Sequence, residues 1–200
     1  QAMENQQLMT IEQLEQILLD YRCENNFTAS DMDALKSDDV DSILPLFLPV
    51  DSEVYYGIAG TAVRTLMRLV DTGLYPDKAY IMQKTEDENG ALQKVEGEKG
   101  FVSALGGKGN ALQFTASVFG QEKFASVDED ALDAIGELLN CINGLYVSEC
   151  KDGSSLELMP PSFKTGIQGF ESRKMLVLPI HIKNDCVDLM IAIGDEIEMK

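Results

Sequence analysis

The stretch from Ala125 to Glu149, ASVDEDALDAIGELLNCINGLYVSE, is the feature that most constrains how this chain can fold. Apolar residues recur in it at intervals of three and four, which at about 100° per residue places them on one stripe of an α-helix. That stripe consists of Leu132, Ile135, Leu139, Ile142 and Tyr146. Ser126, followed three residues later by Glu129, has the spacing of a capping box. The sequence therefore predicts a long helix that starts near Ser126 and buries one face.

A second stripe of the same helix carries Asp133, Glu137, Asn140 and Gly144. It places the carboxylate of Glu137 and the carboxamide of Asn140 side by side, at positions i and i+3. Gly144 follows one turn later, where the missing side chain would let another surface approach closely. The spacing alone leaves two interpretations open: a solvated helix face, which is the commoner case, and a functional site. We expect Glu137 and Asn140 to be neighbours that are accessible to solvent.

The residues around this stripe carry a family resemblance. The segment ELLNCINGLYVSECKDGSSLELMPPSFKTG resembles the part of the CheC/CheX family of chemotaxis phosphatases that contains the signature Glu-x-x-Asn, a later Gly, a Pro-Pro pair and a final Gly. The matching positions are Glu137, Asn140, Gly144, Pro160, Pro161 and Gly166. Leu145 departs from the pattern, because the family often has Asn there. Elsewhere in about 51–200 the resemblance extends only to the order of elements.

The resemblance implies hydrolysis of the aspartyl phosphate on a phosphorylated receiver protein of the CheY type. Asn140 would hold the attacking water, Glu137 would pair with a lysine of the receiver, and Asp133 and Gly144 would contact the partner. The Mg²⁺ would belong to the receiver, so we expect no cofactor bound by this chain. Two alternatives stay open: a non-catalytic receiver-binding module, and a scaffold like the flagellar switch proteins, which share the fold. Some relatives are dimers, which leaves a homodimer open.

Composition narrows the classes of partner. The 200 residues are 44% hydrophobic and 25% charged, as in an ordinary globular protein, and 34 acidic against 16 basic residues give a net charge of −18. Nucleic acids and anionic membranes require a basic face, so neither is an expected partner. The four cysteines show no CxxC spacing, and neither a signal peptide nor a run of about 18 apolar residues is evident. We expect reduced thiols and a cytoplasmic location. With His181 as the only histidine, taken as structural, no metal site is evident.

The chain is expected to consist of an N-terminal extension, residues 1–50, and a CheX-like α+β domain, residues 51–200. In the extension, Thr10 and Gln13 predict a capped helix ending near Arg22, and an acidic linker follows with at most one short helix at 30–36.

The domain is predicted to have long helices packed on a mainly antiparallel sheet. We expect one helix at 51–71 and, besides the helix described above, strands at 79–84, 99–105, 111–119, 156–159, 175–182 and 187–193. Residues 85–98 are expected to be a mobile acidic loop, 106–109 a hairpin turn, and 184–185 a second one. Relatives usually have an extra helix before the signature helix. Here residues 120–125 are too few for it, so we expect that helix to be absent or reduced to a turn.

Overall fold

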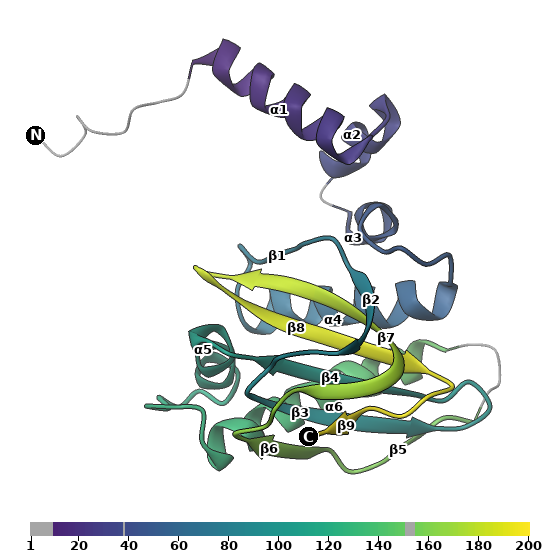
Figure 1. Cartoon of the computed structure of the whole chain (residues 1–200), viewed down its shortest axis with the longest axis vertical. Helices are drawn as coiled ribbons and strands as arrows, with labels where there is room; N and C mark the ends of the chain where they lie inside the picture. Colours follow the sequence, from purple (N-terminus) through teal and green to yellow (C-terminus); the bar gives the residue numbers. More distant parts are fainter. Residues whose placement is uncertain (1–9, 38, 151–154) are drawn as a thin grey trace, which may run out of the picture. The chain divides into compact units, whose positions relative to one another are not determined.

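The computed structural model of the chain describes residues 10–37, 39–150 and 155–200 (Figure 1). The chain divides between Ile43 and Leu44 into two compact units. They are described separately below, the N-terminal unit first.

The N-terminal unit is helical, with α1 (Ile11–Asn25), α2 (Ala29–Leu35) and α3 (Val40–Ile43). The predicted capping box is confirmed, because Gln13 donates its backbone N–H to Thr10 Oγ1 at 3.2 Å and Thr10 donates its own to Gln13 Oε1 at 2.9 Å. The helix runs three residues beyond Arg22. No residue of α1 is buried. The short helix expected at 30–36 is α2.

The second unit contains the helices and strands that position the candidate site. Its helices are η1 (Leu44–Leu46), α4 (Glu53–Leu69), α5 (Asn110–Phe119) and α6 (Glu129–Glu149). Its strands are β1 (Tyr75–Pro76), β2 (Tyr80–Lys84), β3 (Asn89–Glu96), β4 (Phe101–Gly107), β5 (Glu157–Leu158), β6 (Ser162–Thr165), β7 (Phe170–Ile182), β8 (Asp185–Ile193) and β9 (Glu198–Met199).

The described strands form one antiparallel sheet of order β1-β7-β8-β4-β3-β5. In addition, β2 and β9 pair with β7, and β6 pairs with β3. Helices α4 and α6 lie behind the strands in Figure 1, and α5 lies at their left-hand ends. Helix α6 contacts both α4 and α5 as well as β3, β4 and β6. The predicted class, long helices packed on a mainly antiparallel sheet, is confirmed.

The central strand β4 is covered on both faces, since all seven of its residues are buried. Side chains of a strand alternate between faces. Ser103 faces the helices, because it is hydrogen-bonded to Asn143 of α6. Val102 and Ala104 therefore face the other way, into a second apolar cluster with Phe170 and further residues of β7 and β8. The side of the sheet that carries Ser103 is the side that builds the candidate site.

Residues 111–119, predicted as a strand, form helix α5 instead. The buried residues of this helix are Ala111, Leu112, Thr115 and Ala116, which is a helical spacing. The helix is capped from a distant strand, because the Asp185 carboxylate of β8 accepts a hydrogen bond from Ala111 N at 3.2 Å. Two linked expectations are also wrong. Residues 106–109 end β4 and lead into α5, so they do not form a hairpin turn. The helix expected to be absent before the signature helix is present, as α5.

Strand β3 lies in the segment expected to be a mobile loop. It pairs with β4 along all but its last residue, from Asn89 opposite Gly107 to Val95 opposite Phe101. Its buried positions include Gln93, a polar residue where an apolar one would be expected. The segment was predicted as a loop because its composition is polar, although it forms a central strand of the sheet.

Some boundaries also differ from those predicted. Helix α6 begins at Glu129, with Asp128 as its N-cap accepting from Ala131 N at 3.0 Å, so the capping box expected at Ser126 is wrong. The β7–β8 hairpin is confirmed, with its turn at residues 183–184 rather than 184–185, and β7 begins earlier than expected.

Candidate functional site

Helix α6 presents the predicted polar stripe. Asp133 and Glu137 are exposed, whereas Asn140 and Gly144 are half-buried. Four residues of the apolar stripe are fully buried as expected: Leu132, Ile135, Leu139 and Ile142. The fifth, Tyr146, is half-buried. Leu138 and Asn143 are buried too, because α6 is packed between the sheet and two other helices. Glu137 and Asn140 therefore lie one turn apart, at the border between the core and the solvent.

The Pro-Pro segment lies against this part of α6. A Cβ atom added to Gly136 would meet Pro161 Cβ at 3.4 Å, so α6 approaches the start of β6 closely there. Gly144 is different. A Cβ atom added at this position would meet only Leu158 Cδ2, at 3.9 Å, which is ordinary van der Waals contact. Packing within the chain therefore does not require glycine at position 144.

The side chain of Asn140 is tied to a buried polar network. Gln93 of β3, 1% exposed, donates from Nε2 to Asn140 Oδ1 at 2.7 Å and to the Met159 carbonyl at 2.8 Å. Asn143, fully buried, donates from Nδ2 to Gln93 Oε1 at 2.8 Å. Ser103 Oγ lies 2.9–3.0 Å from the amide atoms of Asn143. Asn140 thus has one side-chain atom bound to the core, while Glu137 projects into solvent.

Sequence reasoning missed two members of this network. Asn143 could have been identified from the sequence, because it is a polar residue at a helix position that faces the core. Gln93 offered none, since it lies 47 residues from Asn140 in a segment without strand-like composition. Only the β3–β4 register brings Gln93 and Ser103 together as direct cross-strand partners beneath α6.

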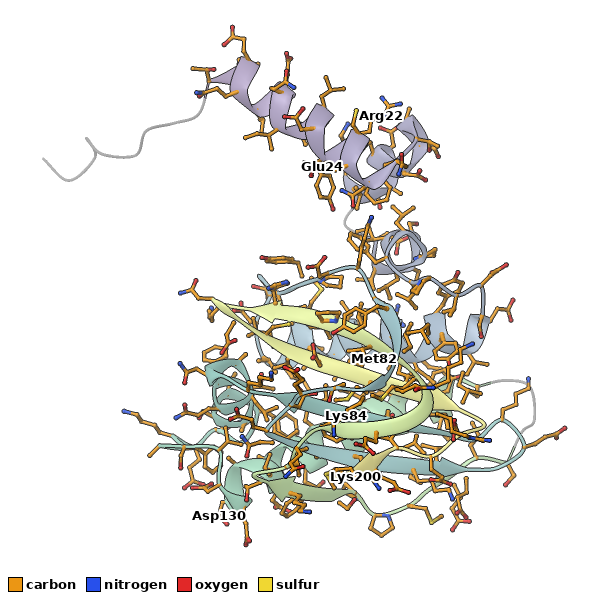
Figure 2. The ribbon with its side chains drawn as sticks, viewed as in Figure 1. Arg22, Glu24, Met82, Lys84, Asp130 and Lys200 are labelled. Atoms are coloured by element: carbon orange, nitrogen blue, oxygen red, sulfur yellow. The ribbon has the colours of Figure 1, made fainter. Side chains whose placement is uncertain are left out.

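The surface near the start of α6 is acidic. The exposed acidic residues of this helix and its cap are Asp128, Glu129, Asp130, Asp133, Glu137 and Glu149. Figure 2 shows Asp130 projecting from the first turn. Acidic side chains at a helix N-terminus are favoured by the helix dipole. These side chains also produce a negative potential beside Glu137 and Asn140, which favours a partner with a basic surface.

A separate cluster of titratable groups lies on the other face of the sheet. Asp188 pairs with Gly106, three residues from Ser103 on β4, and therefore faces away from α6. Burial, and then the charge of Asp87, raise the pKa of Asp188 to about 6. Burial chiefly raises the pKa of the neighbouring Cys186 thiol to about 12. The Cys186 thiol, whose raised pKa lowers its reactivity, and the half-buried Asp188 carboxyl face away from α6, so they are not parts of the α6 site.

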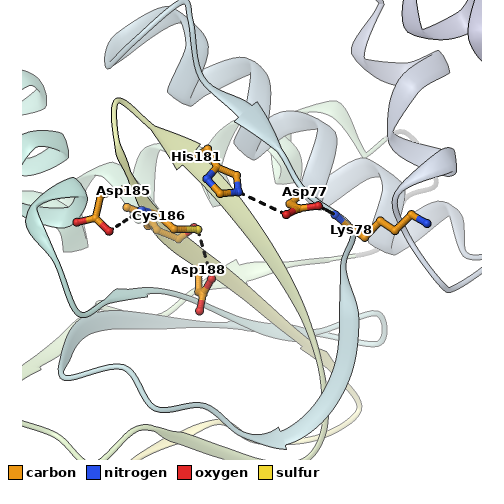
Figure 3. Close-up of polar contacts among 7 residues, drawn as sticks. Asp77, Lys78, His181, Asp185, Cys186 and Asp188 are labelled. Carbon is orange, nitrogen blue, oxygen red and sulfur yellow. Dashed lines mark hydrogen bonds and ion pairs between the residues drawn. The ribbon is translucent and has the colours of Figure 1, made fainter. Parts of the chain in front are cut away.

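His181 has a structural setting. Its Nε2 lies 3.4 Å from Asp77 Oδ2 (Figure 3). Its ring stacks on Tyr75 at 4.8 Å between centroids. Across the described ranges, no three His, Cys, Asp or Glu side chains are placed to hold a metal ion. Within the same ranges, no helix is long and apolar enough to cross a membrane.

Comparison with known proteins was made for sequence and for structure. The family model "Chemotaxis phosphatase CheX" matches residues 90–181, from β3 to β7. The chemotaxis protein CheX from Vibrio vulnificus superposes with a TM-score of 0.61 at 14% identity, covering 72% of this chain and 100% of that one. The second unit therefore has a CheC/CheX-like fold. A comparison with curated proteins gave no match.

Two further solved structures have the same fold as the second unit. A CheC-like superfamily protein from Shewanella sp. PV-4 gives a TM-score of 0.60 at 15% identity, covering 72% of this chain and 99% of that one. CheX from Borrelia burgdorferi, in a complex with CheY, BeF₃ and Mg²⁺, gives 0.54 at 17% identity, covering 70% and 96%. The predicted family resemblance is confirmed, and its signature residues Glu137 and Asn140 lie inside the matched segment.

Proposed function

We propose that this chain is a chemotaxis-type phosphatase that hydrolyses the aspartyl phosphate of a CheY-like receiver. The observation that carries the proposal is the placement of Glu137 and Asn140 one turn apart at the solvent border of α6, within the segment matched by the CheX model. The Borrelia CheX that shares this fold was solved in a complex with CheY, which supports a receiver as the partner.

The chemistry requires little from this chain, because an acyl phosphate is already activated. The oxygen of a water attacks phosphorus in line, the bond from phosphorus to the aspartyl oxygen breaks, and the carboxylate leaves with the electron pair. The water's protons pass to the phosphate and to solvent, giving inorganic phosphate and a free aspartate. The receiver supplies Mg²⁺. This chain has to hold the water in place, a positional effect that can be worth several orders of magnitude in rate.

Asn140 is suited to hold that water. A carboxamide is neutral, so it does not repel the phosphoryl oxygens as a carboxylate would, and it offers both donors and an acceptor. Its attachment to Gln93 at 2.7 Å restricts its rotation before the receiver arrives. A catalytic group that is already in position loses less entropy when the complex forms.

Glu137, Asp133 and Gly144 would make the docking surface. The Glu137 carboxylate is exposed and can pair with a lysine beside the receiver's phosphorylation site. Asp133, one turn earlier and also exposed, extends the negative charge toward the partner. Gly144 leaves space that packing within the chain does not need, which is consistent with close approach of another backbone.

The test is phosphate release from a panel of CheY-like receivers, each phosphorylated with a small-molecule phosphoryl donor and supplied with excess Mg²⁺. The wild-type protein should accelerate release above spontaneous hydrolysis, and Asn140→Ala should abolish most of the acceleration. Cys141→Ser is the matched control, because Cys141 is an exposed neighbour on α6. A control as impaired as Asn140→Ala would contradict the assignment.

A non-catalytic receiver-binding module is the second candidate, and Leu145 favours it. This side chain, 47% exposed, stands on α6 where the family often has Asn, so one polar group of the family's pattern is replaced by an apolar one. Receiver binding without any acceleration of phosphate release would support the module over the enzyme.

A further inference from the structure

One backbone carbonyl determines the orientation of the amides beneath the candidate site. The Met159 carbonyl oxygen can only accept, so the atom of the Gln93 side chain that lies 2.8 Å from it must be the donor nitrogen. The same nitrogen lies 2.7 Å from the Asn140 side chain. The Asn140 atom that faces Gln93 must therefore be the acceptor, Oδ1.

The contacts at the other end of Gln93 agree with this orientation. Its Oε1 accepts from Asn143 Nδ2 at 2.8 Å, and Asn143 is in turn bonded to Ser103. Reversing the Gln93 amide would place its oxygen against the Met159 carbonyl. Because Gln93 is 1% exposed, no water could satisfy the groups left unpaired, and such burial is strongly unfavourable. The Met159 carbonyl therefore holds Gln93 in one orientation.

We propose that Gln93 is a positioning residue that fixes the Asn140 carboxamide with its Nδ2–H donors turned away from the core, toward the reacting phosphoryl group. The inference rests on the proposed phosphatase function. Gln93 acts through Asn140 and does not touch the substrate. The outward N–H groups donate to oxygen at the reaction centre, and the bond from Gln93 prevents the amide from rotating to present its carbonyl oxygen there.

Two buried variants separate positioning from stability. Gln93→Met keeps the length of the side chain but removes the donor to Asn140. Ser103→Ala is the matched control, because it removes a buried hydroxyl from the same network, and that hydroxyl is hydrogen-bonded to Asn143 rather than to Gln93 or Asn140. We expect Gln93→Met to lower kcat for a phosphorylated CheY-like receiver about 10-fold with KM unchanged, since a misplaced catalytic group can cost up to about 100-fold. Ser103→Ala should lower the melting temperature and leave kcat nearly unchanged.

A double-mutant cycle tests whether Gln93 acts through Asn140. In the Asn140→Ala background, Gln93→Met should cause no further loss of kcat, because the group it positions is absent. Additive losses would overturn the proposal. So would wild-type activity in a folded Gln93→Met variant, and that result would leave the phosphatase assignment intact.

NMR on the wild-type ¹⁵N-labelled protein reads the amide orientation without any turnover. The side-chain N–H protons of Gln93 should exchange slowly with water, because they are buried and bonded, and those of Asn140 should exchange fast. Slow exchange of the Asn140 side-chain N–H protons would overturn the proposal even if Gln93→Met fails to fold, because it would mean that these protons face Gln93 and not the solvent. If the wild-type protein shows no turnover, the phosphatase and the catalytic role of Gln93 both fail, while the exchange rates still report whether the orientation is correct.

Discussion

Asp188 provides a stability test that is independent of catalysis. Its pKa is raised to about 6 by burial and by the charge of Asp87, against about 3.8 for the free side chain. A folded-state pKa above the unfolded value means that the native state favours the protonated form. The stabilisation is fully present below pH 3.8 and is lost as the pH rises through about 6.

The size of the effect follows from the shift. About two pKa units at 1.36 kcal/mol each correspond to about 2–3 kcal/mol. Asp188→Asn mimics the protonated acid at every pH. At pH 8 the variant should therefore be more stable than the wild-type protein by about 2–3 kcal/mol, and by pH 4 the difference should shrink toward zero.

Urea unfolding at a series of pH values measures this difference. Glu157→Gln is the matched control, because it removes one acidic charge from an exposed position and so accounts for the change in net charge. A stability difference between Asp188→Asn and wild type that does not grow between pH 4 and pH 8 would refute the reasoning. So would an equal gain in the control.

Three further variants test the packing and the docking surface. Leu139→Ala should cost about 2–5 kcal/mol in denaturant unfolding, because Leu139 is fully buried, and a loss below about 1 kcal/mol would contradict that placement. Gly144→Ala should leave the fold as stable or up to about 1 kcal/mol more stable, since the added methyl group meets only Leu158, yet weaken receiver binding in calorimetry; unchanged binding would refute a docking role. Glu137→Ala should weaken receiver binding, with a smaller loss at high salt because the proposed ion pair is then screened; a loss independent of salt would contradict that pairing.

The sequence predicted what depends on local periodicity. The helical spacing of Leu132, Ile135, Leu139 and Ile142 correctly identified the buried face of α6, and the β7–β8 hairpin followed from two apolar runs around a short turn. Helix α5 was mistaken for a strand because its apolar residues alternate. The residues that the helix buries nevertheless have a helical spacing, and its N-terminus is capped by Asp185, 74 residues away.

The hydrogen-bond network of Gln93, Asn143 and Ser103 could not be predicted either, because it also depends on contacts between residues far apart in the sequence. Gln93 reaches Asn140 only because β3 pairs with β4 beneath α6, and a buried glutamine in an acidic segment has no periodic signal. The pair Glu137 and Asn140, at the solvent border of α6, was predicted from helical spacing together with a family resemblance. Pairing across the sheet, rather than any local pattern, decides which buried side chain holds Asn140.

The most direct measurement of the proposed mechanism is the initial rate of phosphate release from a phosphorylated CheY-like receiver, for the wild-type protein and for Asn140→Ala, with receiver binding measured in parallel. The wild-type protein should exceed spontaneous hydrolysis, and Asn140→Ala should bind with nearly the same affinity while releasing phosphate roughly 10²-fold more slowly, because the water is no longer held in place. An Asn140→Ala variant as active as the wild-type protein would contradict the mechanism, and a wild-type protein that binds the receiver without accelerating release would contradict the enzyme.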